Sequence, residues 1–320
     1  MYSNYPGGFA NGVTIRDVPI INTHPGKVFW VSNASTLQCG QRGGSNGNKG
    51  TYDSPFSTLA YAVTQCIANR GDVIFIKPGH AETISSSTAL TLSIAGVAII
   101  GLGLGSNRPT FTLDTATTAT IKVTAANVAI KNCIFSANFA DIVSFFTLTT
   151  AKNFTLEGNL FKATATNMNS LYVVDTNATS ADCDGLSIIG NKWIEPDTAT
   201  LSMVKMDGTN DNITVTGNYL SLGVNNNKAA IAAIATGKII TNADIGSNRV
   251  YRLNTDSATG ALLVTTDGST NTGMIYSNFV QHADTAAEIL VTASAGFGVF
   301  QNYASGVAGA SGYLLPAADS

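Results

Sequence analysis

A short pattern of apolar and polar positions recurs eight times along this 320-residue chain. Each copy has an apolar first position, an aliphatic third position, a small or polar fifth position, usually Asn at the sixth, and usually an apolar eighth. The alternation in the first half is typical of a β-strand with one buried face, and Gly and Asn after it favour a turn. The copies begin at Val97, Val128, Phe154, Leu186, Ile213, Ala243, Gly273 and Phe297.

The repeated spacing of these copies predicts the architecture. The sixth positions are Leu102, Cys133, Asn159, Asn191, Asn218, Asn248, Asn278 and Asn302, at steps of 24 to 32 residues. A single strand cannot bury its apolar face alone, but stacked copies bury it against one another. We therefore expect an all-β right-handed parallel β-helix, with one coil per copy and coils of variable length. At about 4.8 Å per coil, eight copies form a rod of about 40 Å.

The asparagines at the sixth position have two interpretations. If Asn159, Asn191, Asn218, Asn248, Asn278 and Asn302 stack at one turn, their amides form a ladder along the rod, as in other stacked parallel strands. Alternatively, each Asn serves only its own turn. Both interpretations are structural, and neither gives these residues a catalytic role.

The chain divides into four parts by its pattern. Residues 1–26 are an extended N-terminal arm, 27–71 hold a strand, a loop and a helix, 72–304 form the β-helix, and 305–320 are a flexible C-terminal tail. The helix is expected over 54–71, with Pro55 in its first turn and one apolar stripe. We expect it to cap the open end of the β-helix, because an unpaired sheet edge invites aggregation.

Composition narrows the classes of function. Only 12% of residues are charged, and the net charge is −3 without a basic run, so no nucleic-acid partner is predicted. No signal peptide and no apolar run long enough to cross a membrane occur. Cys39, Cys66, Cys133 and Cys183 lack metal-ligand spacing and are expected to be free buried thiols in a reducing cytoplasm. No cofactor and no metal is predicted.

A search for catalytic groups gives one weak candidate. Asp182 and Asp184, with Asp207 about one coil later, are the best set for the paired carboxyls that glycoside hydrolysis needs. The same segment is also typical of a solvated turn, which is the interpretation we favour. Arg249 and Arg252 have no acidic cluster at a matching position of the repeat. His24, His80 and His282 lie far apart in the sequence, with no Cys, His or acid at ligand spacing. We therefore predict that the chain has no catalytic residues and is not an enzyme.

Aromatic residues near the end of each copy are expected to stack in the core, at Phe135, Phe161, Trp193 and Tyr219. A sugar-binding platform would instead need aromatic residues in exposed positions. Tyr251 and Tyr303 are the candidates for that role, which depends on their exposure.

Two stretches carry a resemblance to known proteins. A helix, a strand ending in Pro-Gly (72–79) and stacked coils with Gly-Asn turns resemble the right-handed parallel β-helix superfamily of pectin and pectate lyases and phage tailspikes. Residues 50–62 and 71–83 are similar to uncharacterised virion proteins of tailed phages. The resemblance implies a capsid decoration or cement (head auxiliary) protein, made in the bacterial cytoplasm and residing in the virion. Its implied partners are the major capsid protein or other virion subunits, in a homotrimer that binds through the two arms. The alternative is a tailspike-like receptor-binding protein or polysaccharide-degrading enzyme, with a surface polysaccharide as partner.

Overall fold

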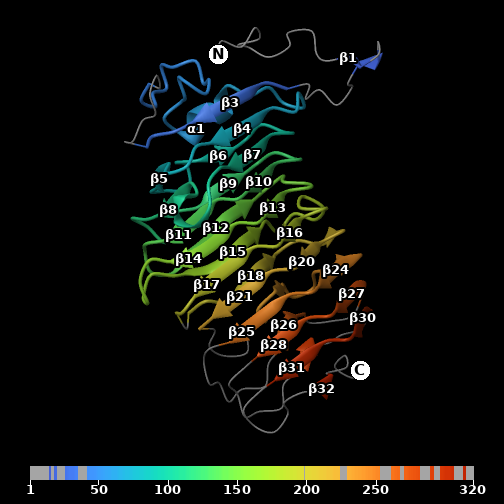
Figure 1. Cartoon of the computed structure of the whole chain (residues 1–320). Coiled ribbons are helices and arrows are strands. Elements are labelled where there is room, and N and C mark those ends of the chain that lie inside the picture. Colours follow the sequence, from blue (N-terminus) through green and yellow to red (C-terminus); the bar gives the residue numbers. More distant parts are fainter. Residues whose placement is uncertain are drawn as a thin grey trace.

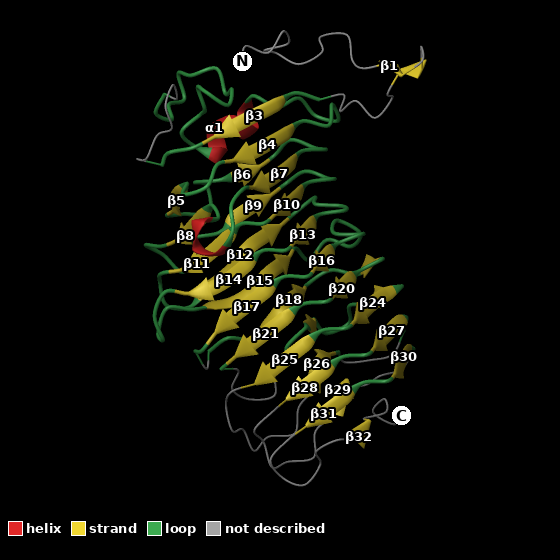
Figure 2. Cartoon of the chain, viewed as in Figure 1, coloured by secondary structure: helices red, strands yellow, loops and turns green. Residues whose placement is uncertain are grey.

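The chain forms a parallel β-solenoid, seen as a stack of coils in Figures 1 and 2. The computed structural model describes residues 14–15, 18–19, 26–34, 42–197, 199–223, 229–252, 261–266, 270–281, 289–291, 296–305 and 313–314. Three sheets of ten, ten and eight strands run along the stack. Most of the predicted N-terminal arm and C-terminal tail, with His24, Cys39 and His282, lies outside the described residues.

Each sheet takes one strand from each successive coil. The first sheet contains β3 (Val28–Val31), β4 (Val73–Ile76), β7 (Ala98–Gly101), β10 (Ala129–Lys131), β13 (Thr155–Glu157), β16 (Ser187–Ile189), β20 (Thr214–Thr216), β24 (Ala243–Gly246), β27 (Gly273–Tyr276) and β30 (Phe297–Phe300). The second contains β5 (Ala81–Ile84), β8 (Thr110–Leu113), β11 (Ile134–Ala137), β14 (Leu160–Ala163), β17 (Lys192–Glu195), β21 (Tyr219–Leu222), β25 (Arg249–Arg252), β28 (Phe279–Gln281), β31 (Tyr303–Ser305) and β32 (Tyr313–Leu314).

The third sheet closes each coil. It contains β6 (Thr91–Leu92), β9 (Ile121–Val123), β12 (Ile142–Leu148), β15 (Ser170–Thr176), β18 (Ser202–Met206), β22 (Ala232–Ile234), β26 (Ala261–Thr265) and β29 (Ile289–Val291). Two short pairs, β1 (Thr14–Ile15) with β2 (Val18–Pro19) and β19 (Asn210–Asp211) with β23 (Ile240–Thr241), form separate two-stranded sheets. Pairing in the long sheets is parallel, except that β32 runs antiparallel to β31.

The register of the sheets confirms the predicted repeat. The third positions of neighbouring copies are paired, as where Ile130 faces Ile99 on one side and Leu156 on the other. The eighth positions are paired in the second sheet, as where Phe161 faces Phe135 and Trp193. Both columns are buried, so each copy contributes to two walls of one continuous core.

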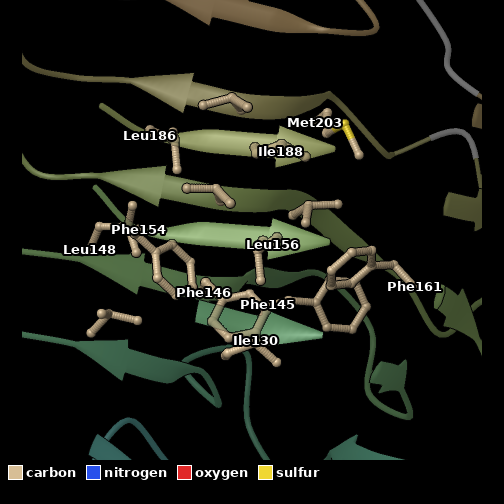
Figure 3. Close-up of a cluster of buried hydrophobic side chains, with 14 of the residues drawn as sticks. Ile130, Phe145, Phe146, Leu148, Phe154, Leu156, Phe161, Leu186, Ile188 and Met203 are labelled. Carbon is tan, nitrogen blue, oxygen red and sulfur yellow. The ribbon is translucent and has the colours of Figure 1, made fainter. Parts of the chain in front are cut away.

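Aromatic rings fill the middle of that core. The rings of Phe111, Phe135 and Phe161 stack at centroid distances of 5.6 and 5.2 Å. Figure 3 shows Phe145 and Phe146 of β12 and Phe161 of β14 in the same interior. Stacked aromatic pairs add stabilisation beyond their burial, so these rings strengthen the contact of coil on coil.

Two predicted core positions are wrong. Leu104, the eighth position of the first copy, is 87% exposed, because the chain leaves the pattern there for a short 3-10 helix at Gly105–Asn107. Phe111 on β8 takes the place that Leu104 was expected to fill. Tyr219 occupies the seventh position of its copy and therefore points outward, with 36% of its surface exposed.

The six asparagines form a continuous buried column. The backbone N–H of Asn159 donates to Asn191 Oδ1 over 2.9 Å, and Asn159 Nδ2 donates to the same oxygen over 3.2 Å. Nδ2 also donates to the carbonyl of Ile130, at the third position of the preceding copy. The same three bonds repeat down the column, as far as the bonds of Asn278 to Asn302. Each amide thus joins neighbouring coils rather than serving its own turn alone.

The residue before each Asn explains the small or polar fifth position. Gly158, Gly190, Gly217, Ser247, Ser277 and Gln301 all have positive φ angles, between 51° and 66°. Glycine adopts this left-handed conformation without strain, and other residues do so less readily. The turn directs each Asn side chain inward, where its exposed fraction is 0–1%.

The N-terminal helix is shorter than predicted and does not form a substantial cap. Helix α1 spans Leu59–Thr64, with Thr58 as its N-cap. The segment expected to be its first turn instead lies along β3, where Phe56 N–H donates to the Trp30 carbonyl and Ser32 N–H donates to the Phe56 carbonyl. These hydrogen bonds of Phe56 pair backbone groups of β3, at the sheet edge that the helix was expected to cover.

Replacement of one Asn in the column should destabilise the rod. In Asn218→Ala, Asn191 loses the acceptor for two donors, and the carbonyl of Ile188 loses its amide donor. Unsatisfied buried polar groups cost about 1–3 kcal/mol each, so the urea midpoint should fall sharply. The matched control is Asn138→Ala, because Asn138 is half-buried and its Nδ2 donates to Asp114 outside the column. Equal midpoints for the two variants would contradict this account.

Candidate functional site

A polar column crosses the outer face of the third sheet. Lys122, Thr147, Asp175 and Lys205 are paired in register on β9, β12, β15 and β18. Each lies between two inward residues, as Lys205 lies between Val204 and Met206. Alternation along each strand therefore places these side chains on the outside, one above the other.

Two carboxylates in this region share one ammonium group. Lys205 Nζ lies 2.6 Å from Asp207 Oδ2 and 3.5 Å from Asp175 Oδ1. It also lies 5.8 Å from the centroid of the Tyr172 ring. The side chains of Asp175 and Asp207 are 16% and 28% exposed, so the cluster is reachable from solvent but largely shielded.

Partial burial shifts the proton affinities of this cluster. Burial raises the pKa of Asp175, and the neighbouring Lys205 only partly offsets that rise. Burial alone would lower the pKa of Lys205, but the hydrogen bond to Asp207 and the charges of both carboxylates raise it. Lys205 therefore remains cationic, and Asp175 holds a proton at a higher pH than a free aspartate does.

A groove adjoins the cluster on the same face. It has a volume of about 290 Å³ and is lined by Ser87, Thr117, Thr118, Thr120, Lys122, Val143 and Thr147. Thr147 is paired with Asp175, so the groove reaches the carboxylates within one coil. Its volume is at the lower end of the range for small-molecule sites.

The structure separates the carboxylates that the sequence suggested. Asp182 Oδ2 accepts a hydrogen bond from Asn177 Nδ2. Asp184 accepts from the backbone N–H of Asp211 and lies 3.6 Å from Lys152. Both occupy the turn before β16, whereas Asp207 interacts with Lys205. Asp182 and Asp184 are thus engaged in local contacts, and Asp207 belongs to a cluster with Asp175.

Sequence reasoning missed Asp175 and Lys205, although a signal for them exists. Lys122, Thr147, Asp175 and Lys205 each follow an apolar residue, and each precedes Val, Leu, Thr or Met at a buried position. This second repeat is shorter than the first and lacks a turn signature, so the spacing of the Asn turns does not reveal it.

His80 is buried and forms hydrogen bonds that link segments of the first coils. Its Nδ1 accepts a hydrogen bond from the Asn33 backbone N–H, and its Nε2 lies 3.2 Å from Glu82 Oε2. Glu82 in turn accepts from the N–H of Leu59, the first residue of α1. His80 thus links the loop after β3 to β5 and α1, a structural position.

The cysteines of the described chain are unreactive. Cys66, Cys133 and Cys183 are free and buried, and burial raises the pKa of each thiol to about 12. The thiolate is the reactive form, so these side chains stay protonated at neutral pH. Within the described ranges no three His, Cys, Asp or Glu side chains are grouped to bind a metal ion. No helix in that part of the chain is long and apolar enough to cross a membrane.

Glu195 is a buried acid inside the rod. It lies on β17 with no exposed surface, and its Oε2 accepts a 3.4 Å hydrogen bond from the Ser170 N–H. Burial raises its pKa to about 8. The carboxyl group is therefore protonated at neutral pH in the folded chain.

Comparisons with known proteins find distant structural similarities. No protein-family model and no curated protein matches its sequence. Among solved structures, a rhamnogalacturonan lyase is similar with a TM-score of 0.47 and 13% identity, over 87% of each chain. The protein ORF18 of Geobacillus virus E2 is similar with a TM-score of 0.37 and 11% identity, over 77% of this chain and 57% of that one. These are similarities to a polysaccharide lyase and a viral protein, and they assign no role to this chain.

The buried Glu195 should make stability depend on pH. Its pKa is about 8 in the folded chain and about 4.5 when unfolded, so the folded state keeps a proton that the unfolded state releases between these values. The free energy of unfolding should therefore fall as the pH rises from about 4.5 to 8, by up to about 1.4 kcal/mol per unit from this group.

Glu195→Gln should remove that part of the pH dependence and raise stability at pH 8. Urea denaturation at several pH values measures both effects. Glu157→Gln is the control, because Glu157 is exposed and paired with Lys131. Parallel pH profiles for the wild type and Glu195→Gln would contradict a neutral Glu195.

Proposed function

We propose that this chain is a structural subunit of a tailed-phage particle, a capsid decoration or cement protein that stabilises the shell as a homotrimer. One observation carries the proposal: the buried column of asparagines that links coil to coil from Asn159 to Asn302. The positions that recur in this chain strengthen the rod along its length. A rigid rod of this kind is suited to bracing neighbouring subunits.

Two further features support the particle assignment. The similarity of residues 50–62 and 71–83 to virion proteins covers the segments that close the first coil. Within them, the Asp72 carboxylate accepts hydrogen bonds from the N–H groups of Lys27 and Ile67 and from Arg70. The low content of charged residues, 12%, is also expected of a surface that is partly covered in an assembly.

The location of the chain in purified particles tests this proposal. The full chain should copurify with heads, and a variant lacking residues 1–26 should fold but fail to incorporate. Circular dichroism verifies folding, and quantitative mass spectrometry of the particles measures incorporation. Absence of the full chain from particles would overturn the proposal, and normal incorporation of the truncated variant would overturn the role of the arm.

A second candidate function is binding or cleavage of a surface polysaccharide. The observation that favours it is the pair Asp175 and Asp207 beside the groove on the third sheet. Glycoside hydrolysis requires two carboxyl groups, one of them protonated, and the raised pKa of Asp175 fits the acid. Lys205 lies between the two carboxylates and forms an ion pair with each of them, which favours the structural function.

An activity assay separates the two functions. The structural proposal predicts neither reducing sugar nor unsaturated product when the chain is incubated with bacterial polysaccharides. If product forms, the second function predicts that Asp175→Asn and Asp207→Asn each lower the rate at least tenfold. Asp184→Asn is the control, because Asp184 is engaged in the turn before β16. Product formed equally by all variants would place the activity elsewhere.

A further inference from the structure

The second sheet has an outer face of apolar, cationic and uncharged polar side chains. We call it the second-sheet face, made of Leu160, Lys162, Lys192, Ile194, Tyr219, Ser221, Arg249, Tyr251, Phe279 and Gln281. Ile194 and Tyr219 are each 36% exposed. Among the described residues of the second-sheet strands β14, β17, β21, β25 and β28, the only carboxylate is Glu195, which points inward. An outer face without acids is unusual in a chain whose net charge is −3.

Aromatic rings on this face contact one another in a row. Tyr219 and Tyr251 lie 5.3 Å apart, Tyr251 and Phe279 5.9 Å, and Phe279 and Tyr303 5.3 Å with nearly parallel rings. Lys192 Nζ lies 5.0 Å from the Tyr219 ring. The first two ring pairs are tilted, at 40° and 53° between ring planes, and the third is stacked. The four rings therefore form a continuous aromatic row on this face.

Cations on the second-sheet face have no acidic partner nearby. In the described part of the chain, Lys162, Lys192 and Arg249 form no ion pair with any acidic side chain. Lys192 and Arg249 are exposed, and Lys162 is half-buried. Their charges are therefore available to a partner that carries carboxylates.

An acidic surface lies across the coil at the same height. We call it the acidic corner, made of Asp175, Asp182, Asp184, Asp207 and Asp211, where the chain passes from the third sheet to the first. Lys152 and Lys205 neutralise only part of it. Lys162 on β14 and Asp175 on β15 belong to one coil, and Lys192 on β17 precedes Asp207 in the next. Because the first and third sheets lie between the second-sheet face and the acidic corner, these surfaces do not meet within one chain.

We propose that the second-sheet face binds the acidic corner of a second copy of this chain. This inference rests on the proposed function, and it identifies the two surfaces through which copies of the chain contact each other. Opposite charges at the same height favour copies that lie side by side and parallel, and complementary charge sets the register of such contacts. The contact is heterologous, so a pair of copies still has one free face and one free corner, and further copies complete a ring where the rotation between neighbours closes.

Charge reversal of the second-sheet face tests the contact. The wild type should sediment at a multiple of the single-chain mass of 33.1 kDa, and added salt should weaken its association. The double variant Lys192→Glu with Arg249→Glu should remain folded by circular dichroism and sediment as a single chain. The control is Arg42→Glu with Lys49→Glu, which changes net charge equally at exposed loop positions and should keep the wild-type mass.

A mixing experiment tests whether the two surfaces are partners. The variant Asp182→Lys with Asp207→Lys reverses charges in the acidic corner and should also sediment as a single chain. Mixed with the face variant, it should associate again, because each copy then meets a complementary surface. If the corner variant does not fold, the face variant and its control decide the proposal.

Three results would overturn the inference: a wild type of single-chain mass at low salt, a face variant that keeps the wild-type mass, or an equal loss in the control. The presence or absence of the chain in purified particles distinguishes a failure of this inference from a failure of the proposed function. A chain that incorporates as a monomer contradicts only the self-contact, and a self-associating chain absent from particles contradicts only the virion function.

Discussion

The fold depends on the register in which each coil lies on the next. Parallel strands fix that register through backbone hydrogen bonds, and the Asn column fixes it again at the turn between the first and second sheets. Because each amide binds two neighbouring coils, a shift of one residue would leave several buried polar groups without partners. The columns of core side chains, from Ile99 to Val299 and from Phe111 to Val280, follow from this alignment.

Much of the fold was predictable because the same few residues set both the pattern and the structure. The aliphatic third position and the following turn give two of the three sheets directly. The N-terminal helix was predicted too long, because Phe56 fits an apolar helical stripe and equally fits the edge of β3. Burial and pairing decide between such alternatives, and a local pattern contains neither.

The candidate site was harder to predict, since its residues meet only through the third sheet. Asp175 and Lys205 are thirty residues apart in sequence and become neighbours because β15 and β18 are paired. The grouping of Asp182 with Asp184 followed sequence proximity, but the turn directs them to separate partners. The exposure of Tyr219 likewise depends on whether the seventh or eighth position points inward, which the register determines.

The Asn column has a direction, and its two ends differ. At the N-terminal end, the N–H of Cys133 donates to Asn159, but the thiol of Cys133 has no amide to continue the column. Each Asn from Asn159 to Asn278 both accepts from the preceding coil and donates to the next, whereas Asn302 accepts from Asn278 and donates back to the Ile275 carbonyl. A coil can therefore be copied between Asn159 and Asn302 without changing the bonding of its neighbours, and each copy would lengthen the rod by about 4.8 Å. The length of this protein is thus adjustable in whole coils, by duplication within the column and not beyond Cys133.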